Sequence, residues 1–237
     1  MSETKNPRVP TKKTAEPEVR VQKQDLYQKV ENVFMHNRNI IVGVIGVIVI
    51  AILGYFGYKQ LYLGPKEEQA ETKIAFAQIN FGKDSLQLAL NGDGINPGFT
   101  QIISDYGNTT TGNLAKYYAG NCYLKLKDFD NAIKNLEDYK PATDELSGLT
   151  HLQLGHAYAE KNDFPKAIEN YKKAGETAKS DIYSPYYYKL AGDLMAMQQD
   201  YKGAKEVYQI IKRDYPLSEE GQGIDKDIAY TETKLGE

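Results

Sequence analysis

The stretch LGHAYAEKNDFPKAIENYKKA (residues 154–174) decides the fold, because its spacing occurs three times in the chain. Within it, Gly155 is followed twelve residues later by Ala167, with Asp163 and Phe164 just ahead of the alanine. The other two copies are Gly120 with Ala132 and Gly192 with Ala204. The glycines lie 35 and 37 residues apart, near the ~34-residue period of a helix-turn-helix repeat. Small residues at these positions let paired helices approach closely, which predicts an all-α stack of helix pairs.

The copies also share a bulky residue three places after each glycine, and the third copy ends at Tyr215 and Pro216. The three bulky residues are Tyr123, Tyr158 and Met195. In these features residues 66–235 resemble the tetratricopeptide repeat family. The resemblance implies an α-solenoid whose role is to bind other proteins rather than to catalyse a reaction.

Three repeats are therefore expected over residues 113–216, with a closing segment on each side. Residues 66–112 are interpreted as degenerate leading helices, in which Asp84 caps a short helix. Residues 217–237 are interpreted as one capping helix that starts at Ser218 and shields the last repeat from water. Within the repeats, Asp128 is expected to cap a second helix, and Ser184 to cap the first helix of the third repeat.

An apolar run, IIVGVIGVIVIAILGYFGY (residues 40–58), precedes the repeats. Its nineteen residues contain no charge and no proline, and a helix of that length crosses a hydrocarbon core of ~30 Å. We therefore expect a single N-terminal transmembrane helix, with the anchor spanning residues 39–63. A cleavable signal peptide fits less well, because the run is long and the preceding tail is extended.

Two segments of different composition precede the anchor. Residues 1–24 are rich in Lys, Glu, Pro and Thr, a composition typical of a disordered tail. Residues 25–38 place apolar side chains at helical spacing, which indicates either an amphipathic juxtamembrane helix or a helical extension of the anchor.

Four glycines of the anchor lie on one side of the expected helix, within an arc of about 80°. They are Gly43, Gly46, Gly54 and Gly57. Such a face suits close packing on another membrane helix or on a second copy of the chain. Glycine is also common in membrane helices in general, so the packing role is one of two interpretations.

The charge distribution favours a cytoplasmic N-terminus. Residues 1–38 carry eight Lys or Arg against five acids, whereas residues 59–237 carry 21 against 27. A positive tail is typical of the inside of the membrane, which would make the repeat domain periplasmic in a bacterial cell. This architecture also resembles the YfgM-like bacterial inner-membrane proteins, which accompany the Sec translocon and periplasmic chaperones. An inverted topology, with a cytosol-facing receptor domain, stays open.

Catalytic and cofactor motifs are not apparent in the sequence. His151 and His156 are five residues apart, about 140° around a helix, a poor arrangement for a pair of metal ligands. The acidic repeat region does not favour nucleic acid as a partner. We therefore expect no enzymatic activity, no cofactor and no metal.

A protein-binding groove is the remaining candidate site, since the first helices of successive repeats line the concave face of such an array. The residues expected to face it are Tyr117, Asn121, Lys125, Leu152, His156, Glu160, Lys189, Asp193 and Met197. The sequence thus predicts a membrane-anchored scaffold or adaptor that binds proteins at the inner membrane and assists protein export. The alternatives are a structural or assembly subunit of an envelope complex, including a homo-oligomer, and the cytosol-facing receptor.

Overall fold

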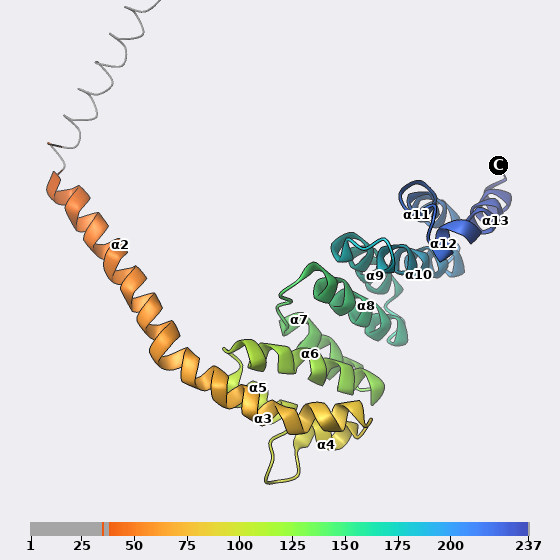
Figure 1. Cartoon of the computed structure of the whole chain (residues 1–237). Helices are drawn as coiled ribbons and strands as arrows, with labels where there is room; N and C mark the ends of the chain where they lie inside the picture. Colours follow the sequence, from red (N-terminus) through yellow and green to blue (C-terminus); the bar gives the residue numbers. More distant parts are fainter. Residues whose placement is uncertain (1–34, 36–37, 237) are drawn as a thin grey trace, which may run out of the picture. The chain divides into compact units, whose positions relative to one another are not determined.

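The computed structural model describes residue 35 and residues 38–236, and the chain divides into two units, up to Lys59 and from Gln60 onward (Figure 1). The first unit contains the apolar helix α2 (Arg38–Tyr58), in which no residue is buried. The expected tail over 1–24 and most of the juxtamembrane segment over 25–38 lie outside the described residues. Among the described residues, one helical segment, Arg38–Gly82, is long and apolar enough to cross a membrane.

The helical segment continues beyond the apolar run. The α-helix of the apolar run ends at Tyr58, and residues Lys59–Leu63 form the π-helical segment η1. These residues include a lysine and a glutamine, so the expected boundary at residue 63 reaches beyond the purely apolar part.

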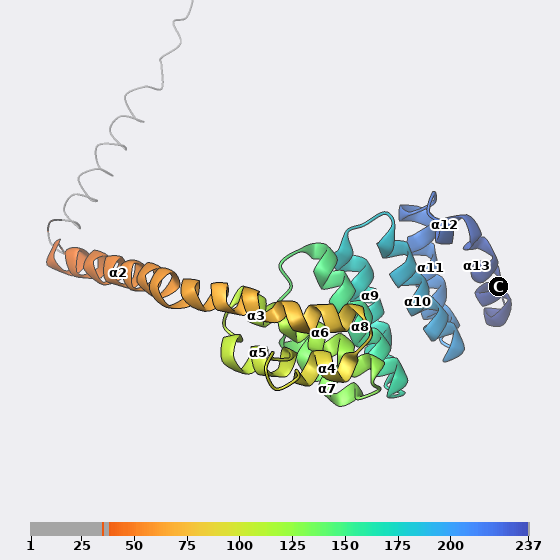
Figure 2. The ribbon, with the colours of Figure 1, turned by 60° about the horizontal axis from the view of Figure 1, so that its bottom comes forward.

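The second unit is a stack of helix hairpins (Figure 2). Its helices are α3 (Gly64–Gly82), α4 (Leu86–Asn91), α5 (Phe99–Tyr106), α6 (Thr110–Lys125), α7 (Phe129–Asp138), α8 (Asp144–Glu160), α9 (Phe164–Ala178), α10 (Tyr183–Met197), α11 (Tyr201–Asp214), α12 (Glu219–Gly223) and α13 (Asp225–Leu235). The three predicted repeats are the hairpins α6–α7, α8–α9 and α10–α11, and each packs against the next. This confirms the predicted all-α solenoid.

The turns inside the three repeats have one geometry. A residue with positive φ precedes an aspartate that begins the second helix. The positive-φ residues are Lys127 (63°), Asn162 (60°) and Gln199 (65°). The aspartates are Asp128, Asp163 and Asp200, and the side chain of each accepts a hydrogen bond from the backbone N–H three residues on. The predicted capping role of Asp128 is thereby confirmed.

The glycines that defined the repeat occupy equivalent helix contacts. A Cβ atom at Gly120 would lie 2.6 Å from Leu136, and one at Gly155 would lie 2.5 Å from the ring of Tyr171. At Gly192 the same atom would run into the ring of Tyr208. In each repeat the obstructing side chain stands sixteen residues after the glycine. Glycine is required here because the second helix places a large side chain directly against the first.

The leading segment contains a fourth hairpin that the sequence pattern did not reveal. Asp84 has φ 58° and Ser85 is the N-cap residue of α4, as in the turns of the three repeats, although the Ser85 side chain makes no capping hydrogen bond. Asp84 was expected to be the cap, but it occupies the positive-φ position instead. Counted from this turn, Ala77 takes the place of the repeat glycine and Ala89 that of the repeat alanine, and both are fully buried.

The second helix of this leading hairpin is interrupted. Helix α4 ends at Asn91, and the helical layer resumes with α5 at Phe99 after a short loop. The hydroxyl of Thr100 donates a hydrogen bond to the carbonyl of Leu90 at 2.7 Å, which ties the two pieces together. The early end of α4 also explains Ala77, because the obstructing position sixteen residues later, Asp93, falls in the loop.

Two expected helix starts lie elsewhere. Helix α6 begins at Thr110 rather than 113, because Thr109 caps it by accepting from the Gly112 N–H at 2.9 Å. Helix α10 begins at Tyr183, one residue ahead of the expected cap Ser184. The hydroxyl oxygen of Ser180 accepts from the Tyr183 N–H at 3.2 Å and supplies the capping bond.

The C-terminal cap is two helices rather than one. Ser218 caps α12 as expected, accepting from the Gly221 N–H at 2.9 Å. The helix is interrupted at Ile224, which is fully buried, and α13 begins at the next residue. Helix α13 packs against α11 and closes the last repeat.

Candidate functional site

In the second and third repeats, the residue that follows the repeat glycine is hydrogen-bonded to the second helix of its own repeat. His156 Nδ1 lies 2.9 Å from the hydroxyl of Tyr171, and the hydroxyl of Tyr208 donates to Asp193 Oδ1 at 2.8 Å. In the first repeat the equivalent partner is Leu136, which has no hydroxyl, and Asn121 Nδ2 donates instead to the carbonyl of Tyr117 at 2.8 Å. His156 and Asp193 therefore join the two helices of their own repeats, whereas the bond of Asn121 stays within α6.

Two predicted groove residues lie in the interior. Asn121 is 8% exposed and Leu152 is 9% exposed, so a bound protein meets neither side chain. Tyr117 is half-buried, and its ring packs against that of Tyr139 with 5.4 Å between centroids. The expectation that all nine residues face an open groove was wrong for Asn121 and Leu152, because tight helix packing at the glycines covers their neighbours as well.

Lys189 and Asp193 belong to a network that fixes the C-terminal cap. Lys189 Nζ lies 2.5 Å from Asp193 Oδ1 and 3.4 Å from Asp227 Oδ2 of α13. The same ammonium group stands 5.4 Å from the ring centroid of Tyr208. Because the network joins α10, α11 and α13, both predicted groove residues have partners within the fold.

Three other predicted groove residues come together around a cavity of about 250 Å³. Lys125, His156 and Glu160 line it, together with side chains of the α6–α7 turn. Lys125 also pairs with Asp84 at 2.8 Å, and Glu160 is exposed. Farther along the stack, Met197 is 75% exposed at the end of α10. Lys125, Glu160 and Met197 are thus the predicted groove residues most open to a partner.

Burial changes the protonation of the His156–Tyr171 pair. It lowers the pKa of His156, an effect partly opposed by the negative charge of Glu160. It also raises the pKa of Tyr171 to about 12. Near neutral pH, a neutral imidazole therefore accepts the hydrogen bond from a protonated phenol.

This shift predicts a loss of stability in mild acid. Above pH ~6.5 the imidazole is neutral in the folded and unfolded chains. Below that value the unfolded chain binds a proton first, so the free energy of unfolding falls until the pH reaches the lower folded pKa. We expect His156→Gln to flatten this dependence between pH 7 and pH 5, measured by urea unfolding of residues 60–237. Tyr171→Phe, which keeps the imidazole buried, should retain the slope; an unchanged slope in His156→Gln would contradict the assignment.

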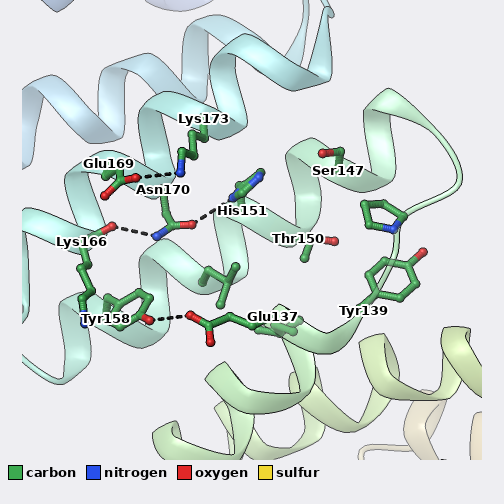
Figure 3. Close-up of a pocket in the computed structure, with 13 residues that line it drawn as sticks. Glu137, Tyr139, Ser147, Thr150, His151, Tyr158, Lys166, Glu169, Asn170 and Lys173 are labelled. Carbon is green, nitrogen blue, oxygen red and sulfur yellow. Dashed lines mark hydrogen bonds and ion pairs between the residues drawn. The ribbon is translucent and has the colours of Figure 1, made fainter. Parts of the chain in front are cut away.

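A larger cavity of about 460 Å³ lies between α7, α8 and α9 (Figure 3). Two pairs of its polar side chains are in contact: Tyr158 donates to Glu137 at 2.7 Å, and His151 Nδ1 lies 2.9 Å from Asn170 Oδ1. The negative charges of two acids along its edge are balanced by the positive charges of two lysines. These residues are Glu137, Glu169, Lys166 and Lys173. Sequence analysis missed this cavity, since its lining comes from three helices and a loop and has no single spacing.

Metal and thiol chemistry find no support in the part of the chain that the structure describes. No three His, Cys, Asp or Glu side chains gather there as metal ligands would. His151 and His156 have separate partners, Asn170 and Tyr171. Burial raises the pKa of the Cys122 thiol to about 12, so this side chain acts as a small apolar group in the core.

Comparison with known proteins agrees with the repeat geometry. A family model described as a tetratricopeptide repeat-like domain matches residues 32–221. The match includes the apolar helix, the leading hairpin and all three repeats. A search of the curated proteins gives no match.

Proposed function

The chain belongs to the tetratricopeptide repeat-like family, and from this premise we propose that it is a membrane-anchored scaffold that binds other polypeptides at the bacterial inner membrane. Repeat domains of this kind generally bind proteins. The proposal adds the membrane anchor, the compartment and the class of client.

One observation carries the anchoring role. Helix α2 exposes its apolar side chains along its whole length, with Ile40, Ile50 and Leu53 each about two-thirds exposed or more (67%, 71% and 66%). A helix of this length and composition is stable where lipid replaces water. Anchoring confines the repeat domain near the membrane surface and raises its effective concentration for membrane partners. Weak contacts to the repeats then suffice for function.

Charge supports the proposed orientation, and the resemblance to YfgM-like proteins supports the proposed clients. A positive tail ahead of the anchor favours a cytoplasmic N-terminus, so the repeat domain faces the periplasm. Its partners are then exported proteins, periplasmic chaperones or the Sec translocon, as the resemblance to YfgM-like proteins implies. Chaperone-like assistance to export is the role that fits this placement.

Crosslinking in intact cells tests the scaffold role. A photoreactive amino acid at Glu160 or Met197 is expected to yield many short-lived adducts with newly exported chains, identified by mass spectrometry. Lys134 on α7 and Gln209 on α11 are matched control positions, since both are exposed on second helices. One stoichiometric adduct would instead indicate an assembly subunit. Adducts no more frequent than at the control positions would contradict binding through the first helices.

A further inference from the structure

A cavity of about 440 Å³ lies at the edge of the third repeat, outside the predicted groove. Residues 181–182 of the α9–α10 connection form one wall, and residues 214–220, from the end of α11 to the first turn of α12, form the other. Figure 2 shows this connection and α12 at the same end of the helix hairpins. The cavity thus lies within the repeat domain, and its existence does not depend on the placement of the anchor.

The cavity has exposed aliphatic side chains. Ile182 is 74% exposed and Leu217 is 89% exposed, and Pro216 lies beside Leu217 in the wall. Single exposed aliphatic residues are ordinary on protein surfaces. Here two of them line one concave site from different segments of the chain, so an apolar side chain placed between them would be shielded from water by both.

The wall that carries Leu217 is held in place. The Ser218 hydroxyl donates to the carbonyl of Tyr215 at 2.9 Å and accepts from the Gly221 N–H at 2.9 Å. The ring of Tyr215 packs near that of Tyr188 with 6.2 Å between centroids. Pro216 restricts the backbone between Tyr215 and Leu217. A ligand therefore meets a preformed wall and loses less free energy in ordering it.

The rim of the cavity is negatively charged. Asp181, Glu219 and Glu220 line it, and within residues 38–236 none of the three forms an ion pair. Two cations close in sequence have other partners: Lys179 pairs with Asp144 at 2.8 Å, and Arg213 pairs with Asp214 at 2.7 Å. Asp214 is thereby neutralised, whereas the other three carboxylates are left to attract a cation.

Charge complementarity distinguishes this cavity from the one in Figure 3, whose acids and lysines balance. Apolar walls with an acidic rim fit an aliphatic side chain that has positive charges on both sides. A peptide supplies this arrangement along its own chain, with lysine or arginine next to leucine or isoleucine. Steering by the negative rim also speeds the encounter with such a segment.

We propose that this cavity binds an extended peptide segment of a partner protein, in which an aliphatic side chain is flanked by lysine or arginine. Ile182, Pro216 and Leu217 contact the aliphatic side chain, and Asp181, Glu219 and Glu220 pair with the cations. The site goes beyond the proposed function, because it lies apart from the first-helix groove and requires no particular membrane orientation. A failure here leaves the scaffold role to its own test by crosslinking at Glu160 and Met197.

The test uses the full chain in phosphatidylcholine nanodiscs, with empty discs as background. The probe is a C-amidated peptide, Lys-Leu-Lys-Leu-Lys, labelled with fluorescein at its N-terminal amine, and binding is followed by fluorescence anisotropy. We expect saturable binding that weakens as salt is added. Leu217→Ser should weaken it about tenfold, because the aliphatic contact is lost. Glu219→Gln with Glu220→Gln should weaken it by a similar factor and reduce its dependence on salt.

Matched controls are available within the same chain. Ile95→Ser removes a side chain that is 91% exposed but far from the cavity in sequence, and Glu145→Gln removes an exposed first-turn acid of α8. Both should bind as the unsubstituted chain does. The peptide Glu-Leu-Glu-Leu-Glu should bind at least tenfold more weakly, and Glu219→Lys with Glu220→Lys should reverse this preference. Equal binding by the Leu217→Ser and control variants, or equal binding of the two peptides, would overturn the proposal.

Discussion

Replacing Gly192 by valine is expected to lower the free energy of unfolding of the repeat domain by about 3 kcal/mol. The first added atom would lie 2.8 Å from Cδ1 of Tyr208 and closer still to the neighbouring ring carbon. The ring cannot turn aside, because Tyr208 is only 2% exposed and its hydroxyl is bonded to Asp193. The helix would have to separate from its partner. Urea unfolding of residues 60–237 measures the loss.

A matched control and a compensating change make this result specific. Gly82 also lies in a helix, but nothing stands within 4 Å of a Cβ atom there. Gly82→Val should therefore change stability by less than about 0.5 kcal/mol. Combining Gly192→Val with Tyr208→Leu should cost less than the sum of the two single changes, since the smaller side chain yields room. If the two changes in the free energy of unfolding were strictly additive, the side chains at positions 192 and 208 would not clash.

The repeat could be predicted because the spacing of its residues follows from a contact between its two helices. A glycine and the large side chain sixteen residues later meet in each of the three repeats, so the chain carries the same pattern at Gly120, Gly155 and Gly192. The leading hairpin escaped this reasoning because Ala77 replaces glycine. The alanine is tolerated where α4 ends early, and the early end is set by a loop that has no counterpart in the repeats. The twelve-residue spacing from Ala77 to Ala89 was the available signal.

The binding surface was harder to predict, and the reason is physical. Positions next to a glycine lie on the first helix, but their exposure depends on which side chain the second helix presents. Tyr171 and Tyr208 offer a hydroxyl and engage His156 and Asp193, whereas Leu136 offers none. The break at Ile224, which gives the cap a second helix and brings Asp227 to Lys189, likewise depends on packing at the end of the stack. Cavities lined by connecting segments cannot be predicted from the repeat, because these segments have no periodic sequence pattern.

The second large effect concerns the membrane. Replacing Ile45 and Ile48 together by aspartate is expected to prevent insertion of α2. Each isoleucine contributes about −0.5 kcal/mol to insertion at the centre of a span and each aspartate opposes it by about 3 kcal/mol, so the pair shifts the balance by about 7 kcal/mol. The membrane fraction after alkaline carbonate extraction should fall sharply. A reporter enzyme that is active only in the periplasm, fused after Glu237, should lose its activity at the same time.

Charge placed beyond the apolar run serves as the control. Gln60→Asp with Leu61→Asp adds the same two carboxylates in η1, just past the end of α2, where water and headgroups solvate them. The chain should stay in the membrane fraction and the reporter should stay active. Retention of the Ile45→Asp, Ile48→Asp chain in the membrane would mean that contacts other than α2 hold it there. An inactive reporter in the unsubstituted fusion, with the chain still in the membrane fraction, would contradict the proposed orientation, because a positive tail that stays inside places the repeat domain in the periplasm.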